Sequence, residues 1–221
     1  MILIGMFDSP FVRRVAVTMN LLGMPFEHRN WSVGKDFDKI REFNPLGRVP
    51  TLVLDDAEAL IESGTILDFL DDSVGPARAL LPPSGRARRD ALRLMAIATG
   101  AAEKGVLQLY EGVFRPEGKR HEPWLDRCRA QMHAALTELE RAAQARTSNR
   151  ESLEAVGAWL VGDRMTQADI TVACVFNFLN EALGAGDSDR YPALGAMSRG
   201  CEALAAFQAS KAPWFSPDRK R

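Results

Sequence analysis

The sequence predicts two structural units in tandem: a small α/β unit with a mixed sheet, then an all-helical unit. Three observations support this prediction. The first eighty residues follow the order β-α-β-α-β-β-α. A proline- and glycine-rich stretch, 75–85, then interrupts the pattern. Beyond it only helical periodicity remains. We therefore expect an α/β unit at 1–80, a linker at 81–85, an all-helical unit at 86–210 and a tail at 211–221.

Each element of the α/β unit has a local signal. Residues 2–6 are apolar, and Ser9-Pro10 is typical of an N-cap followed by proline at the first helical position. Gly23 ends this first helix. A strand, a short helix, a hairpin of two strands and a helix capped by Ser63 are expected next, at 25–31, 36–43, 51–54, 59–62 and 63–74. The β-α-β start implies a parallel strand pair, whereas the hairpin adds antiparallel strands, so the sheet should be mixed.

The all-helical unit shows its clearest signal late in the chain. Apolar spacing first indicates long helices at 92–113 and 123–145. Thr166-Gln167-Ala168-Asp169 then resembles a capping box, with aspartate in place of the usual Glu or Gln. Residues 170–179 are nearly all apolar, which indicates a helix buried on most sides. Thr166 and Asp169 are therefore interpreted as structural, and losing the cap in Asp169→Ala should cost about 1 to 2 kcal/mol.

Composition excludes several classes of function. The chain has 221 residues, 46% of them hydrophobic, a net charge of -1 and a pI of about 6.3. This balance does not predict binding to nucleic acid or to an anionic membrane. No apolar run approaches the roughly 18 to 20 residues that span a bilayer. The apolar start, 1–7, stops at Asp8 without a basic lead, so we interpret it as a strand and not as a signal peptide.

Cysteine and histidine usage points to a reducing compartment and away from a metal site. Three widely spaced cysteines contain no CxxC pair, which fits buried thiols in the cytoplasm. His28, His121 and His133 are scattered without metal-ligand spacing, so no metal is expected.

Pro50 marks the entrance of the third strand. Because proline has no N–H to donate to a sheet, it must lie at a strand start, an edge or a bulge. The Val49–Pro50 bond is open to the cis form, and Val49 is driven to an extended conformation either way. Its main-chain groups would then offer an edge to an extended peptide. An ordinary strand start explains the same residues.

Three features should meet at one end of the predicted sheet. Ser9 follows the first strand, Val49-Pro50 opens the third, and Glu62-Ser63 joins the last strand to its helix. Ligands of open α/β sheets bind beyond strand ends and at helix N-termini.

With these motifs in order, the chain resembles the cytosolic glutathione transferase family over almost its whole length. The features are the β-α-β-α-β-β-α unit, Val49-Pro50, Glu62-Ser63 and the cap at 166–169. The resemblance implies a thioredoxin-like first unit that binds glutathione as co-substrate. It also implies an acceptor pocket for a small electrophile between the units, and a homodimer.

The resemblance also implies roles in holding glutathione. Val49, ahead of a cis Pro50, would exchange backbone hydrogen bonds with the cysteinyl unit. Ser63 would bind the γ-glutamyl carboxylate from its helix N-terminus, and Glu62 would face the ammonium group. Either Lys35 or Arg48 would meet the glycine carboxylate; both stay open.

Ser9 has two interpretations. Ser9-Pro10-Phe11 fits the frame that is Cys-Pro-Phe in other classes of the family, so Phe11 is included among the glutathione-binding residues. A hydroxyl that donates to a thiolate lowers the thiol pKa, and helix N–H groups add to this effect. The alternative is that Ser9 is only a helix cap.

The activity implied is transfer of glutathione to an electrophile. Glutathione-dependent isomerisation or dehalogenation, and a non-catalytic binding module, are the alternatives. Without a cysteine in the first unit, chemistry through an enzyme mixed disulfide is not expected. Tyr110, Phe114 and Arg115 are candidates for the acceptor pocket. Arg13 and Arg14 either pair with acids across a domain or subunit boundary or lie on a solvated helix face.

Overall fold

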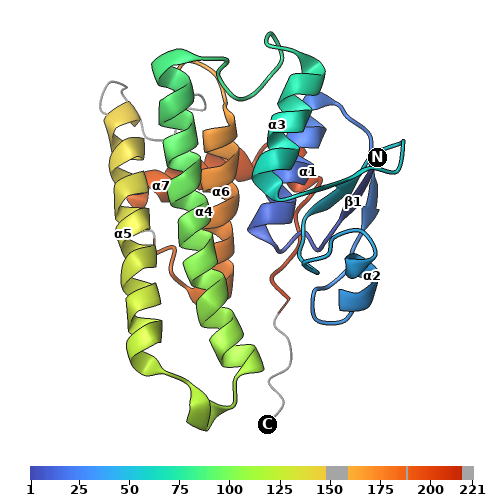
Figure 1. Cartoon of the computed structure of the whole chain (residues 1–221). Coiled ribbons are helices and arrows are strands. Elements are labelled where there is room, and N and C mark those ends of the chain that lie inside the picture. Colours follow the sequence, from blue (N-terminus) through green and yellow to red (C-terminus); the bar gives the residue numbers. More distant parts are fainter. Residues whose placement is uncertain (148–158, 188, 216–221) are drawn as a thin grey trace.

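The structure, a computed structural model, describes residues 1–147, 159–187 and 189–215. Figure 1 shows two units side by side, with the sheet and α1 to α3 in one and the long helices α4, α5 and α6 in the other. The elements of the first unit are β1 (Ile2–Ile4), α1 (Pro10–Leu22), β2 (Glu27–Arg29), α2 (Phe37–Arg41), β3 (Thr51–Val53), β4 (Ala59–Ile61) and α3 (Ser63–Val74). Those of the second are α4 (Gly85–Phe114), η1 (Glu117–Lys119), α5 (Glu122–Thr147), α6 (Gln167–Leu183), α7 (Pro192–Glu202) and α8 (Ala205–Gln208).

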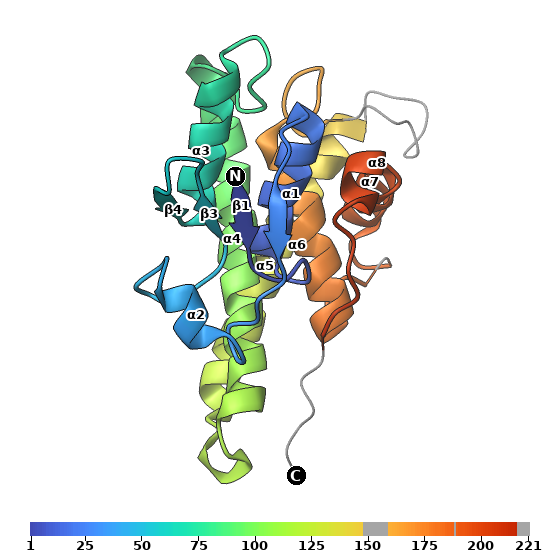
Figure 2. The ribbon, with the colours of Figure 1, turned by 90° about the vertical axis from the view of Figure 1, so that its right-hand side faces the viewer.

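The sheet is mixed, as predicted. Its strand order is β2-β1-β3-β4, with β1 and β2 parallel and the other two pairs antiparallel. Leu3 pairs with Leu52, and both belong to the core shared with α1 and α3. On the opposite face Ile4 packs with Ile40 of α2. Helices therefore cover both faces, as a sheet with apolar residues on each side requires (Figure 2).

The ends of several predicted elements were wrong by one to three residues. β1 stops at Ile4, because Gly5 adopts a φ of +130° at which a side chain would be strained. A Cβ on Gly5 would lie 2.5 Å from Val12 and 2.8 Å from Val49, so the glycine also permits the close approach of these two residues. The prediction that Ser63 caps α3 was wrong: Glu62 occupies the cap position and Ser63 is the first helical residue.

Helices are the only regular elements in the described part of the second unit. α6 is buried on most sides, as predicted, and its N-terminus carries the capping box of Thr166 and Asp169. In the described part of the chain, no helix combines the length and apolar character needed to cross a membrane. Residues 216–221 of the expected tail lie outside the described residues.

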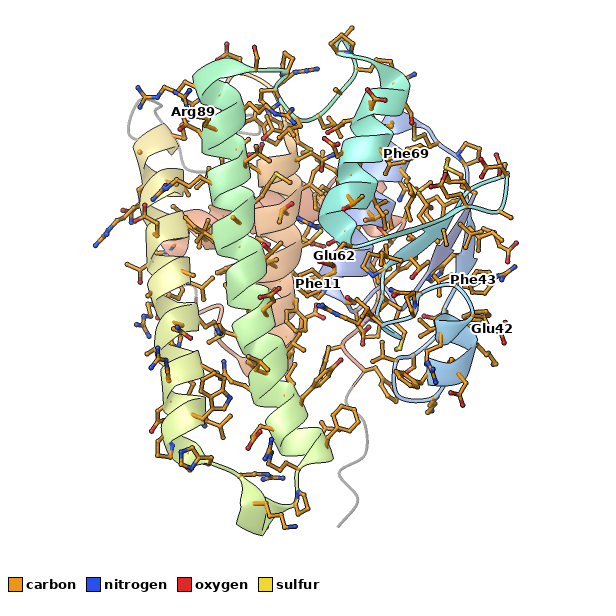
Figure 3. All side chains as sticks on the ribbon, in the orientation of Figure 1. Phe11, Glu42, Phe43, Glu62, Phe69 and Arg89 are labelled. Carbon is orange, nitrogen blue, oxygen red and sulfur yellow. The ribbon has the colours of Figure 1, made fainter. Side chains whose placement is uncertain are left out.

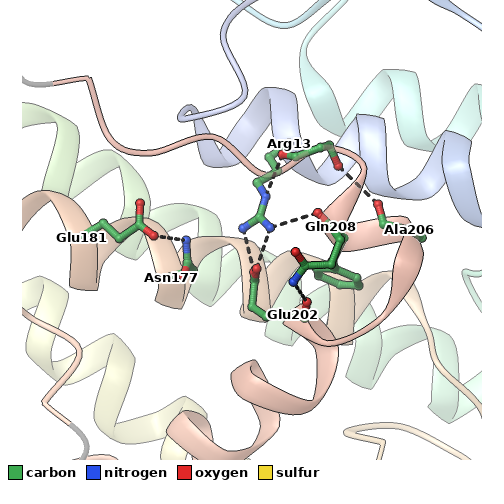
Figure 4. A network of polar contacts seen from close by, with 8 residues as sticks. Arg13, Asn177, Glu181, Glu202, Ala206 and Gln208 are labelled. Carbon is green, nitrogen blue, oxygen red and sulfur yellow. Dashed lines mark hydrogen bonds and ion pairs between the residues drawn. The ribbon is translucent and has the colours of Figure 1, made fainter.

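Polar side chains tie α1 to the C-terminal part of the chain. Arg13 bonds both carboxylate oxygens of Glu202 at 2.6 and 2.7 Å, and its Nε donates to the Ser210 carbonyl at 3.1 Å (Figure 4). Thr18 donates to the Gln167 side chain at the start of α6. These contacts fix the position of α1, and with it the end of the sheet from which α1 starts, relative to the helical unit.

Candidate functional site

The Ser9 hydroxyl lies at the N-terminus of α1 and is only weakly engaged. Ser9 is the N-cap residue, with Pro10 at the first helical position. Its Oγ accepts from the Val12 nitrogen at 3.5 Å, well beyond the common N–H···O distance of about 2.9 to 3.0 Å. The side chain is half-buried. A partner other than the helix therefore has access to this hydroxyl.

The Val49–Pro50 bond is cis and directly precedes β3. Thr51 pairs with Ile4, so the ladder ends one residue after the proline. Neither main-chain group of Val49 forms a hydrogen bond with another described residue. Val49 is half-buried and packs against the core with its side chain. Its N–H and C=O thus remain available at the end of the sheet.

At the N-terminus of α3, Ser63 is buried and Glu62 is exposed. The Ser63 Oγ accepts a hydrogen bond from Arg14 Nη2 at 2.8 Å. An acceptor for the Ser63 hydroxyl proton is not found within the described residues. Glu62 has a φ of +67°, in a region that residues other than glycine rarely adopt. Figure 3 shows Glu62 and Phe11 on the side of the α/β unit that faces α4.

Arg14 is a buried cation without a carboxylate partner. Among the described residues, its guanidinium forms hydrogen bonds only with Ser63 and, at 3.2 Å, with the Thr171 hydroxyl, and its Nε has no partner there. No ion pair involving Arg14 occurs within the described part of the chain. Burial lowers its pKa to about 10, so the group stays charged at pH 7. A buried positive charge that forms no ion pair with a described carboxylate therefore contacts Ser63.

Both alternatives predicted for Arg14, pairing with an acid and a solvated position, were wrong. Arg13, by contrast, does pair with an acid, Glu202, across the boundary between the two units. A weak signal for burial of Arg14 was present, because Val12 and Val15 flank the two arginines in an apolar helix.

Lys35 and Arg48 are exposed cations that form no ion pair with a described carboxylate. The Lys35 Nζ lies 5.3 Å from the ring centroid of Phe215. Arg48 ends a turn that begins at Asn44, and the Asn44 side chain stabilises this turn by donating to the Arg48 carbonyl at 2.8 Å. Neither cation is committed to a partner that would keep it from a carboxylate ligand.

The three acceptor-pocket candidates, two at the end of α4 and Arg115 directly after it, differ in orientation. Tyr110 and Phe114 are exposed, with ring centroids 5.0 Å apart. Partial burial of its hydroxyl raises the Tyr110 pKa, and the charges of Arg48 and Asp8 in the α/β unit also act on this hydroxyl. Arg115 instead turns back along its helix, where it pairs with Glu111 at 2.9 Å.

Sequence reasoning missed Asp8 and Phe215. The Phe215 nitrogen donates to Asp8 Oδ2 at 3.2 Å, next to Ser9. Burial raises the Asp8 pKa. The neighbouring Trp214 packs edge-on against Phe178 of α6 at 5.5 Å, and a cavity of only about 10 Å³ is left beside the Ser9 turn. The only sequence signal for a role of Asp8 at this site was its position directly before Ser9.

The histidines do not form a metal site within the described residues. His28 stacks on Phe7 with ring centroids 3.7 Å apart, and His133 bonds the Tyr191 hydroxyl at 3.0 Å. In the described part of the chain, no group of three His, Cys, Asp or Glu side chains is suited to a metal ion.

Family models and known proteins agree on one family. The N-terminal domain of glutathione S-transferases matches residues 3–78, and the C-terminal domain of the same family matches residues 122–196. Together the two matches cover about two thirds of the chain. Among curated proteins, the uncharacterised GST-like protein YibF of Escherichia coli is 28% identical over 178 residues, which is 80% of this chain and 81% of that protein.

Solved structures give the same result over the full length. A glutathione S-transferase from Methylobacterium radiotolerans, in complex with glutathione sulfonate, is 29% identical with a TM-score of 0.86, covering 100% of this chain and 98% of that one. A second, from Methylobacillus flagellatus with glutathione bound, is 25% identical with a TM-score of 0.84, covering 96% and 99%. The chain belongs to the glutathione S-transferase family.

Proposed function

We propose that the protein is a glutathione transferase. Its α/β unit, 1–80, binds glutathione and lowers the pKa of the thiol, and the thiolate attacks a small electrophile between the two units. The observation that carries the proposal is the hydrogen bond between Ser63, at the N-terminus of α3, and the buried Arg14, which forms no ion pair with a described carboxylate.

The γ-glutamyl end of glutathione fits this helix N-terminus. Its α-carboxylate would accept from the Ser63 hydroxyl and from the unpaired N–H groups of the first turn. Because Ser63 already accepts from Arg14, its own O–H is polarised and becomes a stronger donor. Arg14 supplies the opposite charge below. Glu62, exposed beside Ser63, would face the ammonium group.

The remaining proposed contacts would bring the sulfur to Ser9. Val49 and cis Pro50 would hold the cysteinyl unit by its backbone, and Lys35 or Arg48 would meet the glycine carboxylate. Ser9 would then donate to the thiolate, which favours the ionised form of the thiol. Phe11 lies on the same side of the unit (Figure 3).

The chemical step needs no other group from the protein. The thiol proton goes to solvent, and the sulfur forms a bond with the electrophilic carbon as the leaving group departs with its electron pair. Tyr110 and Phe114 would form a wall of the acceptor pocket. Arg115 is paired with Glu111 and is the weakest of the three acceptor candidates.

Retention on immobilised glutathione tests the proposal. The wild-type protein should be retained and eluted by free glutathione, whereas Ser63→Ala should pass through. Ser73→Ala is the matched control, because Ser73 lies on the same helix, is exposed and bonds only the Phe69 carbonyl. Equal retention of both variants would contradict the γ-glutamyl assignment.

Turnover separates the enzyme from a binding module. We expect conjugation of glutathione to chlorodinitrobenzene, together with an ultraviolet thiolate band in the bound complex. Retention and a thiolate band without turnover would favour a specialised substrate, as in an isomerase or dehalogenase. Retention with neither would favour a non-catalytic module.

The proposal extends to the assembly and its location. A homodimer is the state that the resemblance implies, and light scattering after gel filtration would measure it. Cytoplasmic location is supported by Cys128, Cys174 and Cys201, which are all buried free thiols.

A further inference from the structure

The Arg14 side chain joins the N-terminus of α3 to the helical unit. Its Nη2 donates to the Ser63 Oγ at 2.8 Å, and its Nη1 donates to the hydroxyl of Thr171, on α6, at 3.2 Å. All three residues are buried, with exposed fractions of 4% for Arg14, 2% for Ser63 and 0% for Thr171. One guanidinium thus connects the proposed glutathione site with a residue of the other unit, where α1 packs against α6.

The guanidinium can transmit a position because it is rigid. Its three nitrogens lie in one plane at fixed angles, so an anchor on Nη1 also restricts where Nη2 can lie. Among the described residues, only Thr171 bonds Nη1, and Nε has no partner. The position of Nη2, and with it that of the Ser63 side chain, therefore depends on a threonine of α6.

The contact with Arg14 also sets the direction of the Ser63 hydroxyl proton. Because the Ser63 oxygen accepts from a cation, its own hydrogen points away from Arg14. A Cβ on the next residue, Gly64, would lie 3.8 Å from Nη2, so the guanidinium packs against the first turn of α3. The Ser63 hydroxyl is thereby directed as a donor to a ligand at the N-terminus of this helix.

Stability alone does not account for a charge at Arg14. A buried charge without an ion pair destabilises a fold, and an apolar side chain at this position would join the units without that cost. The joint already contains the Arg13–Glu202 ion pair and the hydrogen bond from Thr18 to Gln167. Natural proteins keep such unfavourable groups mainly at functional sites. The arrangement of Arg14 therefore indicates a role in binding.

We infer that Thr171 is a positioning residue for glutathione, although it belongs to the helical unit and acts without touching the ligand. Thr171 holds Arg14, and Arg14 holds the Ser63 hydroxyl in the direction from which it donates to the γ-glutamyl carboxylate. This role rests on the proposed function of the α/β unit. It makes recognition of the γ-glutamyl end depend on the packing of α1 against α6.

Calorimetric titration of the full-length protein with two S-hexyl ligands tests this role. One is S-hexylglutathione, and the other is S-hexyl 4-aminobutanoyl-Cys-Gly, which lacks only the γ-glutamyl α-carboxylate. Thr171→Val replaces the hydroxyl by a methyl group and should weaken binding of the first ligand about fivefold or more. The second ligand should bind wild type and variant equally, because it has no carboxylate for Ser63. Thr171→Ser keeps the hydroxyl and should restore binding to within about twofold of wild type.

Thr18→Val is the matched control. Thr18 is a buried threonine of α1 that also bonds across the boundary, to Gln167 of α6, but its hydroxyl does not bond the Arg14 guanidinium. The control should lower the unfolding temperature about as much as Thr171→Val does, and leave the affinity for S-hexylglutathione within about twofold of wild type. Equal weakening of binding in the two variants would show that loosened packing is the cause, and would overturn the positioning role.

The outcomes separate this role from the proposed function. If the wild type binds S-hexylglutathione and Thr171→Val binds it equally well, the positioning role is overturned and the proposed function stands. If the wild type binds neither ligand, both are overturned. Thr171→Ala leaves space instead of a methyl group beside the guanidinium, so it provides a second variant should Thr171→Val fold poorly, and it should show the same loss of affinity.

Discussion

The Ser9 hydroxyl would have two roles: it caps α1, and it would donate a hydrogen bond to the glutathione thiolate. The 3.5 Å distance from its Oγ to the Val12 nitrogen indicates that capping uses this group weakly. Aspartate caps helices as well as serine does, but it has no proton to donate and would repel a thiolate. The two roles can therefore be separated by a substitution that keeps one and removes the other.

Ser9→Asp should lower kcat/KM for conjugation by on the order of 10²-fold, the effect of removing one donor to a developing anion. Urea unfolding should show wild-type stability, because the cap remains. Ser9→Ala should lose a similar amount of activity while its glutathione binding stays measurable. Full activity in Ser9→Asp would show that Ser9 is only a cap.

Glu62 combines a strained backbone with a proposed binding role. A φ of +67° at a residue other than glycine costs about 1 to 3 kcal/mol. Glu62→Gly should therefore raise the free energy of unfolding by about 1 kcal/mol, yet weaken glutathione binding at least tenfold. Glu62→Gln keeps the backbone cost and removes the charge, so it should weaken binding without a gain in stability. A glycine variant that binds glutathione normally would remove Glu62 from the site.

Local sequence signals located most of the candidate site residue by residue. Ser9-Pro10 and Glu62-Ser63 each predict a helix start and Val49-Pro50 predicts a strand start, features that depend on neighbours in the chain. The environment of Arg14 was not predictable in this way. Its partners Ser63 and Thr171 are 49 and 157 residues away, and only the packing of α1 against α3 and α6 brings them together.

At the scale of elements, the N-terminus of α6 is held by one carboxylate. Asp169 accepts from the Thr166 nitrogen at 2.7 Å, the Thr166 hydroxyl at 2.8 Å and the Leu160 nitrogen at 2.7 Å. The sequence predicted the contact with Thr166 from the capping-box pattern. The bond to Leu160 joins the preceding loop to the helix, and no pattern within the helix predicts it.

Asp169→Ala should consequently cost more than the 1 to 2 kcal/mol of a lost cap. Two buried backbone N–H groups would lose their acceptor, at about 1 to 3 kcal/mol each. We expect a loss of about 3 kcal/mol or more in urea unfolding, against about 1 kcal/mol for Thr166→Ala. Similar losses in the two variants would mean that the loop bond contributes little.

Prediction of elements was accurate in type and poor at the ends. The strands are three residues long, shorter than the predicted ranges; β1, for example, ends where Gly5 takes a positive φ. Apolar spacing placed Leu125, Cys128 and Met132 on the buried face of α5, where they lie. A helix face is set by periodicity alone, whereas a strand end depends on which residues find a partner in the sheet.

For the whole molecule, the contacts that join its two units matter most, and the Arg13–Glu202 ion pair is one of them. The Arg13–Glu202 pair spans 189 residues of sequence, and its side chains are 4% and 13% exposed (Figure 4). Both charges have thus left water and depend on each other. Sequence reasoning named a pair with an acid as one alternative for Arg13, but the choice of Glu202 follows only from the packing of α7 and α8 on α1.

Removing one partner of this pair should be more harmful than removing both. Arg13→Met and Glu202→Met should each lower the free energy of unfolding by about 3 to 5 kcal/mol, since each leaves a buried charge unpaired. The double variant should recover much of that loss, because no charge is then stranded. A double-mutant cycle from urea unfolding measures the coupling. Strictly additive losses would show that Arg13 and Glu202 are not coupled and that their ion pair does not stabilise the joint between the units.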